Sequence, residues 1–235
     1  MRFRFNSREL NGFKARLTER LIERYMEQHL IPQLRREEKW DFIVYLVVPW
    51  CSIGGSFRDE SAFFLSNGVF PTRDLLRSFE RVTKALNNVP DGFLVKLKKT
   101  GKSKTLKAGL KEMGWKRGES FRRSGYFSTE LISSFSSPTD WQEKGYRIQR
   151  EIVFKTDGYE ERVLPIVDGE IEIVEVKCGT SNLAPSQIES YRNAMKQGCS
   201  LRYFHVEIVS FERNEFNVEE RLITNPNEVR YQIRS

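Results

Sequence analysis

The sequence predicts an α/β protein, and three patterns lead to that prediction. Apolar residues recur at helical spacing over about residues 7–30, an uninterrupted apolar run follows at 42–48, and short alternating segments precede a further helical pattern after residue 146. With 235 residues, 39% hydrophobic and 30% charged, the chain has the composition of a globular protein that buries a proper core. This length is enough for one large domain or two small ones.

The first half of the chain predicts helices and strands in turn. In order, we expect a helix over about 7–30, a strand at 42–48, a helix that begins at Thr72, a loop at 87–92, a strand at 93–97 and a helix closed by Gly114. Pro32 is expected to stop the first helix, Thr72 to cap the second, and Gly114 to end the third.

The second half of the chain predicts mostly strands. The serine-rich residues 128–140 are expected to hold a linker. Beyond it we expect strands at 146–154, 162–167 and 171–177, a helix over about 184–196 and a strand at 201–209. Asp168-Gly169 is expected to be a tight turn that joins the strands on either side of it into a hairpin. The mixed pattern of residues 216–233 does not predict a helix or a strand.

Positive charge is concentrated in one segment. The net charge of the chain is +7, whereas residues 96–123 hold eleven Lys or Arg against two acids, a net charge of +9. Aromatic residues are interleaved with these cations, which favours nucleic-acid binding through phosphates and exposed bases over a merely solvated face. The residues expected to bind DNA are Lys98, Lys99, Lys102, Lys104, Lys107, Lys111, Lys116, Arg117, Arg122 and Arg123.

Several classes of protein are excluded by what the sequence lacks. The longest apolar run, 42–48, is too short to cross a bilayer and no signal peptide is evident, so we expect a cytoplasmic protein without a membrane partner. Cys51, Cys178 and Cys199 do not suit a disulfide framework, a four-thiolate zinc site or an iron–sulfur cluster. A homodimer is left open.

Glu175-Val176-Lys177 lies at the end of an expected strand. Side chains two residues apart in an extended chain point to the same face, roughly 7 Å from each other. A carboxylate at this place can hold a hard divalent cation, and an ammonium beside it can orient a water or stabilise the charge that builds on a phosphate. Hydrolysis of a phosphodiester needs both groups.

A metal site needs a second acid, and the preceding strand offers candidates. If Asp168-Gly169 is a tight turn, Asp168 lies about 20 Å along the strand from Glu175 and cannot share an ion with it. A three-residue loop would instead place Glu161 opposite Glu175, whereas a two-residue loop would place Arg162 opposite Glu175 and Glu160 opposite Lys177. Glu161 is therefore the first choice, and Asp168 remains only if the strands bend or the loop is wide.

The run from Glu161 to Gly179 resembles the RecB-type branch of the PD-(D/E)XK nucleases. It offers an acid on one strand, a turn, and an apolar strand that ends in acid-x-Lys followed by a small residue. Gln187 and Tyr191 match the Gln-x-x-x-Tyr element of that branch on the following helix. The pattern covers about residues 140–210 and is also similar to archaeal Holliday-junction resolvases and virus-type replication-repair nucleases. It departs from the family in having Glu where Asp is usual, without the preceding Pro, and in lacking iron–sulfur cysteines.

The resemblance implies a fold, an activity and a set of site residues. The fold would be a restriction-endonuclease-like mixed sheet with helices on both faces, and the activity would be Mg²⁺- or Mn²⁺-dependent hydrolysis of DNA, as in an endonuclease of DNA repair. The metal ligands would be Glu175, the carbonyl of Val176 and an upstream acid, Glu161 or Asp168; the catalytic residues would be Glu175, Lys177, Gln187 and Tyr191. Lys177 would position or activate water, and Gln187 would orient the substrate or Lys177.

Two domain organisations are open. In one, residues 1–135 form an N-terminal α/β region that contains a basic, winged-helix-like module at about 70–127, and residues 136–235 form the nuclease-like core. In the other, the first helix and the 42–48 strand belong to that same core, and the basic module is an insertion.

Two further functions are open besides the nuclease. A non-catalytic DNA-binding replication or regulatory protein would keep a degenerate nuclease-like fold and bind DNA without taking up metal. An assembly protein would use the basic segment to bind a protein partner instead of DNA.

Overall fold

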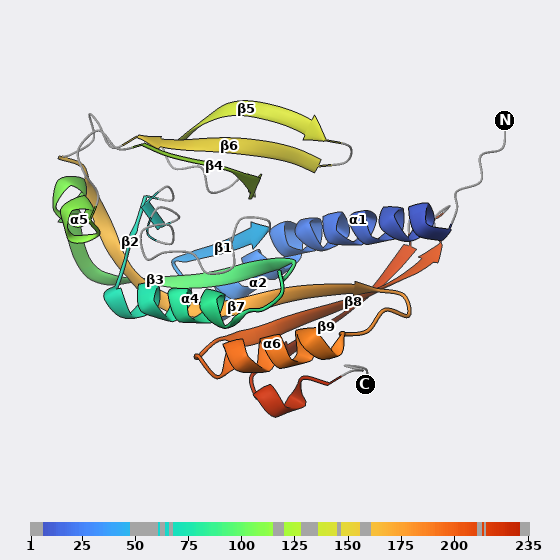
Figure 1. Ribbon diagram of the computed structural model, residues 1–235. Coiled ribbons are helices and arrows are strands. Elements are labelled where there is room, and N and C mark those ends of the chain that lie inside the picture. The colour runs from blue at the N-terminus through green and yellow to red at the C-terminus, as the bar shows by residue number, and fades with distance from the viewer. Residues whose placement is uncertain are drawn as a thin grey trace.

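The computed structural model describes residues 7–47, 61, 64–65, 68–114, 120–127, 136–144, 147–155, 161–210, 213 and 215–230. These residues form a mixed α/β protein, as the sequence predicts, in which helices pack on both faces of a mostly antiparallel sheet (Figure 1). The helices are α1 (Ser7–Tyr25), a π-helical turn (Met26–Leu30), α2 (Ile31–Glu37), α4 (Arg73–Ala85), α5 (Leu106–Glu112), α6 (Pro185–Met195) and a short 3₁₀ turn (Pro226–Glu228). The strands are β1 (Phe42–Val47), β2 (Phe70–Pro71), β3 (Gly92–Thr105), β4 (Ser120–Phe127), β5 (Ser136–Lys144), β6 (Arg147–Lys155), β7 (Val163–Cys178), β8 (Ser200–Ser210) and β9 (Glu215–Ile223).

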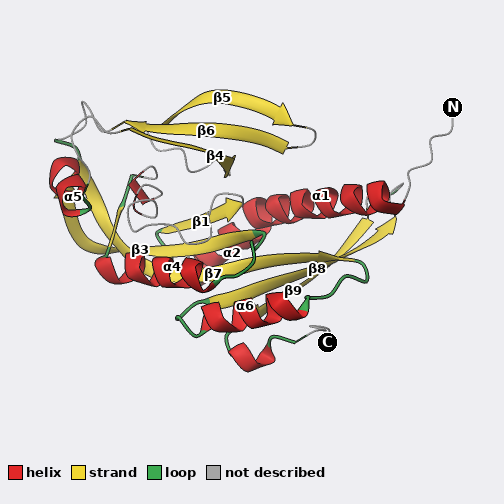
Figure 2. Ribbon diagram, in the orientation of Figure 1, coloured by secondary structure: helices red, strands yellow, loops and turns green. Residues whose placement is uncertain are grey.

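The sheet is built around β7. Its main strands follow the order β1-β3-β7-β8-β9, in which only the β7–β8 pair is parallel, and the short β2 pairs in parallel with the first part of β7. β4 extends the order beyond β1 through two residue pairs and also pairs with β6, which pairs with β5 (Figure 2). The strands predicted at 42–48, 146–154 and 201–209 and the helix predicted at 184–196 are confirmed as β1, β6, β8 and α6.

Alternating strand residues feed two hydrophobic cores, one on each face of the sheet. Phe93 and Val95 of β3 point to the face covered by α4 and α6, where Phe79 and Tyr191 are fully buried. Leu94, between them in sequence, points to the other face, which α1 and α2 cover. A third cluster packs α5 against the first residues of β7. The sheet is therefore the middle layer of three.

The first helix is longer than predicted, because Pro32 does not stop it. α1 continues through the π-helical turn into α2, and Pro32 lies in the first turn of α2. The π-helical turn just before Pro32 accommodates a residue that has no backbone N–H to donate.

β7 is one continuous strand where the sequence predicts a hairpin. It pairs antiparallel with β3 from Val163 to Val174, and Asp168 and Gly169 lie within the strand, opposite Lys98 and Leu97. The predicted turn is therefore wrong. An Asp-Gly pair forms a hairpin only where the segments before and after it pair with each other. Here both segments pair with β3 instead.

Both halves of the chain contribute to the main sheet. β1 and β3 come from the first half, and β3 pairs with β7 along most of its length. A division near residue 135 would separate these hydrogen-bonded strands. Within the segment expected to form a basic module, α4 and β3 belong to the layers of this sheet, and the strand predicted at 93–97 extends to Thr105.

Candidate active site at the end of β7

Glu175 lies near the end of β7 and is only 2% exposed. Lys177 Nζ lies 2.5 Å from Glu175 Oε1, Gln187 Nε2 donates to the same oxygen at 2.9 Å, and the Tyr191 hydroxyl donates to Oε2. These donors offset the cost of burying the carboxylate. The structure thus brings together the four residues that the sequence singles out as catalytic.

α6 presents Gln187 and Tyr191 on one face, as their spacing of four residues predicts. The helix begins at Pro185, whose fixed φ suits a first helical turn. The hydroxyl of Tyr191 also accepts from Asn88 Nδ2 at 3.0 Å. Burial, followed by the charge of Glu175, raises the pKa of Tyr191, so the phenol keeps its proton and remains a hydrogen-bond donor.

Asp91, at the start of β3, is the acid that lies beside Glu175. Gly92 pairs with Val174 in the antiparallel ladder, and the next residues outward on the two strands are Asp91 and Glu175. Asp91 Oδ2 accepts from the backbone N–H of Val176 at 2.7 Å. Burial, and then the charge of Glu175, raise the pKa of Asp91 to about 7. The two carboxylates are therefore close enough to repel each other, and a cation between them would relieve that repulsion.

Sequence reasoning missed Asp91 because Pro90, Asp91 and Gly92 are turn-forming residues and suggest a loop. The available signal was the position of an acid immediately before an apolar strand. In an antiparallel pair, the first residue of one strand lies beside the last residues of its neighbour. Such an acid is a candidate partner for Glu175 once β3 and β7 are known to pair.

Glu161 and Asp168 are not at this site, so the expectation that Glu161 lies opposite Glu175 is wrong, and so is the choice of Asp168 as an alternative metal ligand. Asp168 lies on the same strand as Glu175, seven residues earlier, which is about 23 Å in an extended chain. It accepts a hydrogen bond from the Thr72 hydroxyl at 2.9 Å. Glu161 is exposed and precedes the first residue of β7, at the opposite end of the strand. Both placements follow from the continuity of β7; Glu160 lies outside the described residues.

A cavity of about 620 Å³ opens at this end of the sheet. Asp91, Val176 and Lys177 line one side of it, and the turn at 178–181 continues that wall. α1 supplies the facing side through residues that include Glu19. The site is therefore reached through a concave entrance with acidic and basic groups at its wall, as expected of a site for a charged ligand.

The ligands available at this site suit Mg²⁺ better than a metal ion whose ligands must all come from the protein. Among the residues that the structure describes, no three His, Cys, Asp or Glu side chains are grouped to hold an ion. Asp91 and Glu175 offer two carboxylates, and the carbonyl of Val176, the residue after Glu175, is the further ligand that the sequence resemblance implies. Mg²⁺ commonly keeps several waters and uses one or two carboxylates, so this set would suffice.

The basic segment forms the end of the sheet away from the site. We call residues 98–112, which comprise the outer part of β3 and α5, the arm. Most of the arm's lysines are exposed: Lys98, Lys99, Lys102, Lys107 and Lys111. Lys104 pairs with Glu112 within the arm, and Lys98 Nζ lies 4.6 Å from the centre of the Trp40 ring.

The remaining predicted DNA-binding residues have other positions. Arg122 and Arg123 lie on β4, and Lys116 and Arg117 lie outside the described residues. Lys96, counted in the same basic segment, is 4% exposed and lies 2.9 Å from Glu172 Oε1, so it is a buried ion-pair partner.

Comparisons with protein-family models, with curated proteins and with solved structures return no match for this chain. In the part of the chain that the structure describes, no helix combines the length and apolar character needed to span a membrane. The function is therefore inferred from the geometry of the chain itself.

Proposed function

We propose that this protein is a Mg²⁺-dependent nuclease that hydrolyses DNA phosphodiester bonds. The observation that carries the proposal is the meeting of two acids from neighbouring strands, Asp91 and Glu175, with the ammonium of Lys177 beside them. Helices on both faces of a mixed sheet are consistent with a restriction-endonuclease-like fold, and the exposed lysines of the arm are consistent with a polyanionic substrate.

Each residue of the site has a distinct part in the proposed reaction. Asp91, Glu175 and the carbonyl of Val176 would hold the ion, which when bound polarises the phosphate and makes a water more acidic. Gln187 and Tyr191 hold the carboxylate of Glu175 in one orientation through their hydrogen bonds to its oxygens. Lys177 places a positive charge beside Glu175, where it stabilises the charge that builds on the phosphate.

Cleavage of supercoiled plasmid in Mg²⁺ tests this proposal. We expect Lys177→Ala and Asp91→Asn each to slow nicking by on the order of 10²-fold or more, because each removes a charge that acts in the transition state. Asp168→Asn is the matched control, since it neutralises an acid of β7 that lies away from the cavity. Equal cutting by the wild type and Lys177→Ala would contradict the assignment, and loss of cutting in Asp168→Asn would show that Asp168, and not only Asp91, is needed for the reaction.

A non-catalytic DNA-binding protein is the second candidate, and one observation favours it. Both carboxylate oxygens of Glu175 already accept from protein donors, Oε1 from Lys177 and Gln187 and Oε2 from Tyr191. Calorimetric titration with Mg²⁺ separates the two candidates. A nuclease takes up the ion and loses it in Glu175→Ala, whereas salt-sensitive DNA binding without metal uptake indicates the non-catalytic protein.

A further inference from the structure

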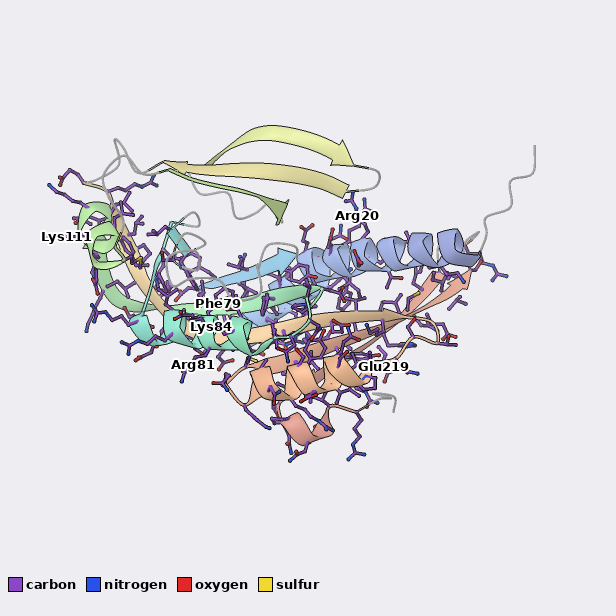
Figure 3. The ribbon with its side chains drawn as sticks, viewed as in Figure 1. Arg20, Phe79, Arg81, Lys84, Lys111 and Glu219 are labelled. Atoms are coloured by element: carbon purple, nitrogen blue, oxygen red, sulfur yellow. The ribbon has the colours of Figure 1, made fainter. Side chains whose placement is uncertain are left out.

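α4 carries a row of four exposed cations on the side that faces away from the sheet. Its buried side is apolar and includes Phe79, while the outward row, here called the α4 row, consists of Arg73, Arg77, Arg81 and Lys84. In Figure 3, Arg81 extends outward from α4 and Phe79 lies toward the sheet. The first three members are four residues apart, so they follow one stripe of the helix, about 6 Å from one to the next.

α4 connects the arm to the candidate active site. At its start, Arg73 Nε lies 3.2 Å from Glu112 Oε1 of the arm. Just beyond its end, the backbone N–H of Asn87 donates to Ser190 Oγ at 2.8 Å, and Asn88 donates to Tyr191, which itself donates to Glu175. The α4 row therefore begins at the basic arm and ends beside the site.

The charges of the α4 row are only partly neutralised. Glu80 pairs with Lys84 at 2.6 Å, and Glu112 pairs with Arg73. Within the described residues, neither Arg77 nor Arg81 has an acidic partner within ion-pair distance. The middle of the row is thus available to an anionic ligand outside the chain.

We infer that the α4 row binds the phosphate backbone of duplex DNA. Arginine suits this ligand because its planar guanidinium donates two parallel hydrogen bonds to a phosphate. From Arg73 to Lys84 the row extends about 17 Å, which at one phosphate per strand for every ~3.4 Å corresponds to roughly five base pairs. Arg73 lines one pocket together with Lys102 and Lys104 of the arm, so the basic charge continues from the α4 row into the arm. The inference rests on the proposed function only in taking DNA as the substrate.

Binding without cleavage tests the inference. Fluorescence anisotropy of a labelled 30-base-pair duplex in EDTA, measured over a series of salt concentrations, compares the wild type with Arg77→Ala/Arg81→Ala. Each phosphate contact contributes about 0.9 to the slope of log affinity against log salt concentration, so the double variant should lose about 2 units of slope and bind more weakly regardless of DNA sequence. The control is Arg36→Ala/Arg213→Ala, which removes the same charge from exposed residues outside α4 and the arm and should keep the wild-type slope.

The outcomes separate this inference from the nuclease proposal. An unchanged slope in Arg77→Ala/Arg81→Ala, or the same loss in the control, overturns the inference and leaves α4 as a solvated face or a contact for an acidic protein. Absence of duplex binding in the wild type overturns it as well. If Arg77→Ala/Arg81→Ala loses salt dependence of binding while the wild type does not cut DNA, the result supports phosphate binding by the α4 row and refutes the nuclease proposal. Melting curves of both variants check that the substituted proteins remain folded.

Discussion

At the scale of single residues, the candidate site depends on carboxyl groups held in unfavourable surroundings. Glu175 is buried and its carboxylate faces three donors, whereas Asp91 beside it has one backbone donor and a pKa raised to about 7. Glu23 of α1 is a partly buried acid; burial, and then the charge of Glu23, raise the pKa of Tyr45. Such groups make a site costly to fold and responsive to pH and to cations.

Glu23 makes the stability of the protein depend on pH. Burial raises the pKa of Glu23 from 4.5 to about 7, although Arg20 lowers it in part. Between these values the folded protein holds a proton that the unfolded chain releases. The stability contributed by this proton is complete below pH 4.5 and is lost as the pH rises through about 7, by at most about 3 kcal/mol.

Urea unfolding at pH 5, 6, 7 and 8 without divalent ions measures this effect. We expect the unfolding free energy of Glu23→Gln to increase relative to that of the wild type as the pH rises, because the amide has no proton to lose. Glu37→Gln, which changes an exposed acid of α2, should follow the wild type. Parallel curves for the wild type and Glu23→Gln would show that Glu23 titrates alike in the folded and unfolded states.

At the scale of elements, β3 and β7 determine the geometry of the site because their register places Asp91 beside Glu175. A chain of ionic contacts crosses the sheet on the face covered by α1. Glu172 of β7 lies 2.9 Å from Lys96 of β3 and 2.5 Å from Arg202 of β8. Arg202 also pairs with Glu220 of β9, which accepts from Tyr25 of α1 at 3.0 Å. Removing one member of such a buried network leaves another charge uncompensated, which makes the register costly to change.

Gly169 is required by the close approach of the same two strands. A Cβ at this position would overlap the carbonyl oxygen of Lys96 in β3. We expect Gly169→Ala to lower the unfolding free energy by about 2–3 kcal/mol, because the backbone of β3 must move to admit the methyl group. Denaturant unfolding followed by circular dichroism measures the loss.

Gly101→Ala is the comparison for Gly169→Ala. Gly101 has a φ of +77° and open space around its Cβ position, so an alanine there costs only backbone strain, about 1 kcal/mol. If Gly169→Ala lowered the unfolding free energy no more than Gly101→Ala, β3 and β7 would be shown to separate easily at this point.

At the scale of the whole molecule, the sheet joins residues from both halves of the chain. β7 pairs with β3 on one side and with β8 on the other, and helices from both halves cover its faces. Ile173 and Val174 of β7 are fully buried, each in the core of a different face. These side chains lose their cover if the first half is removed.

A fragment comprising residues 136–235 should therefore not fold alone. It would keep β7, β8, β9 and α6 but would lose β1, β3, α1, α2 and α4. We expect a circular dichroism spectrum of an unfolded chain and no cooperative thermal transition, against a single sharp transition for residues 1–235. A cooperative transition in the fragment would instead support a nuclease-like domain that is separate from the first 135 residues.

The sequence by itself determined the features that depend on neighbours within one element. Thr72 accepts from the backbone N–H of Leu75 as a helix cap, Glu175 and Lys177 share a face of their strand, and Gln187 and Tyr191 share a face of α6. Helical and extended periodicities are local, so a few residues specify them.

Only the tertiary structure decided which acid meets Glu175 and whether Asp168-Gly169 turns. Asp91 and Val176 are 85 residues apart in the sequence, and their contact exists because β3 pairs with β7. The same pairing keeps Asp168-Gly169 extended, although its composition favours a turn. Strand pairing of this kind depends on which distant segment pairs most favourably with a strand, and a local pattern of residues does not specify that segment.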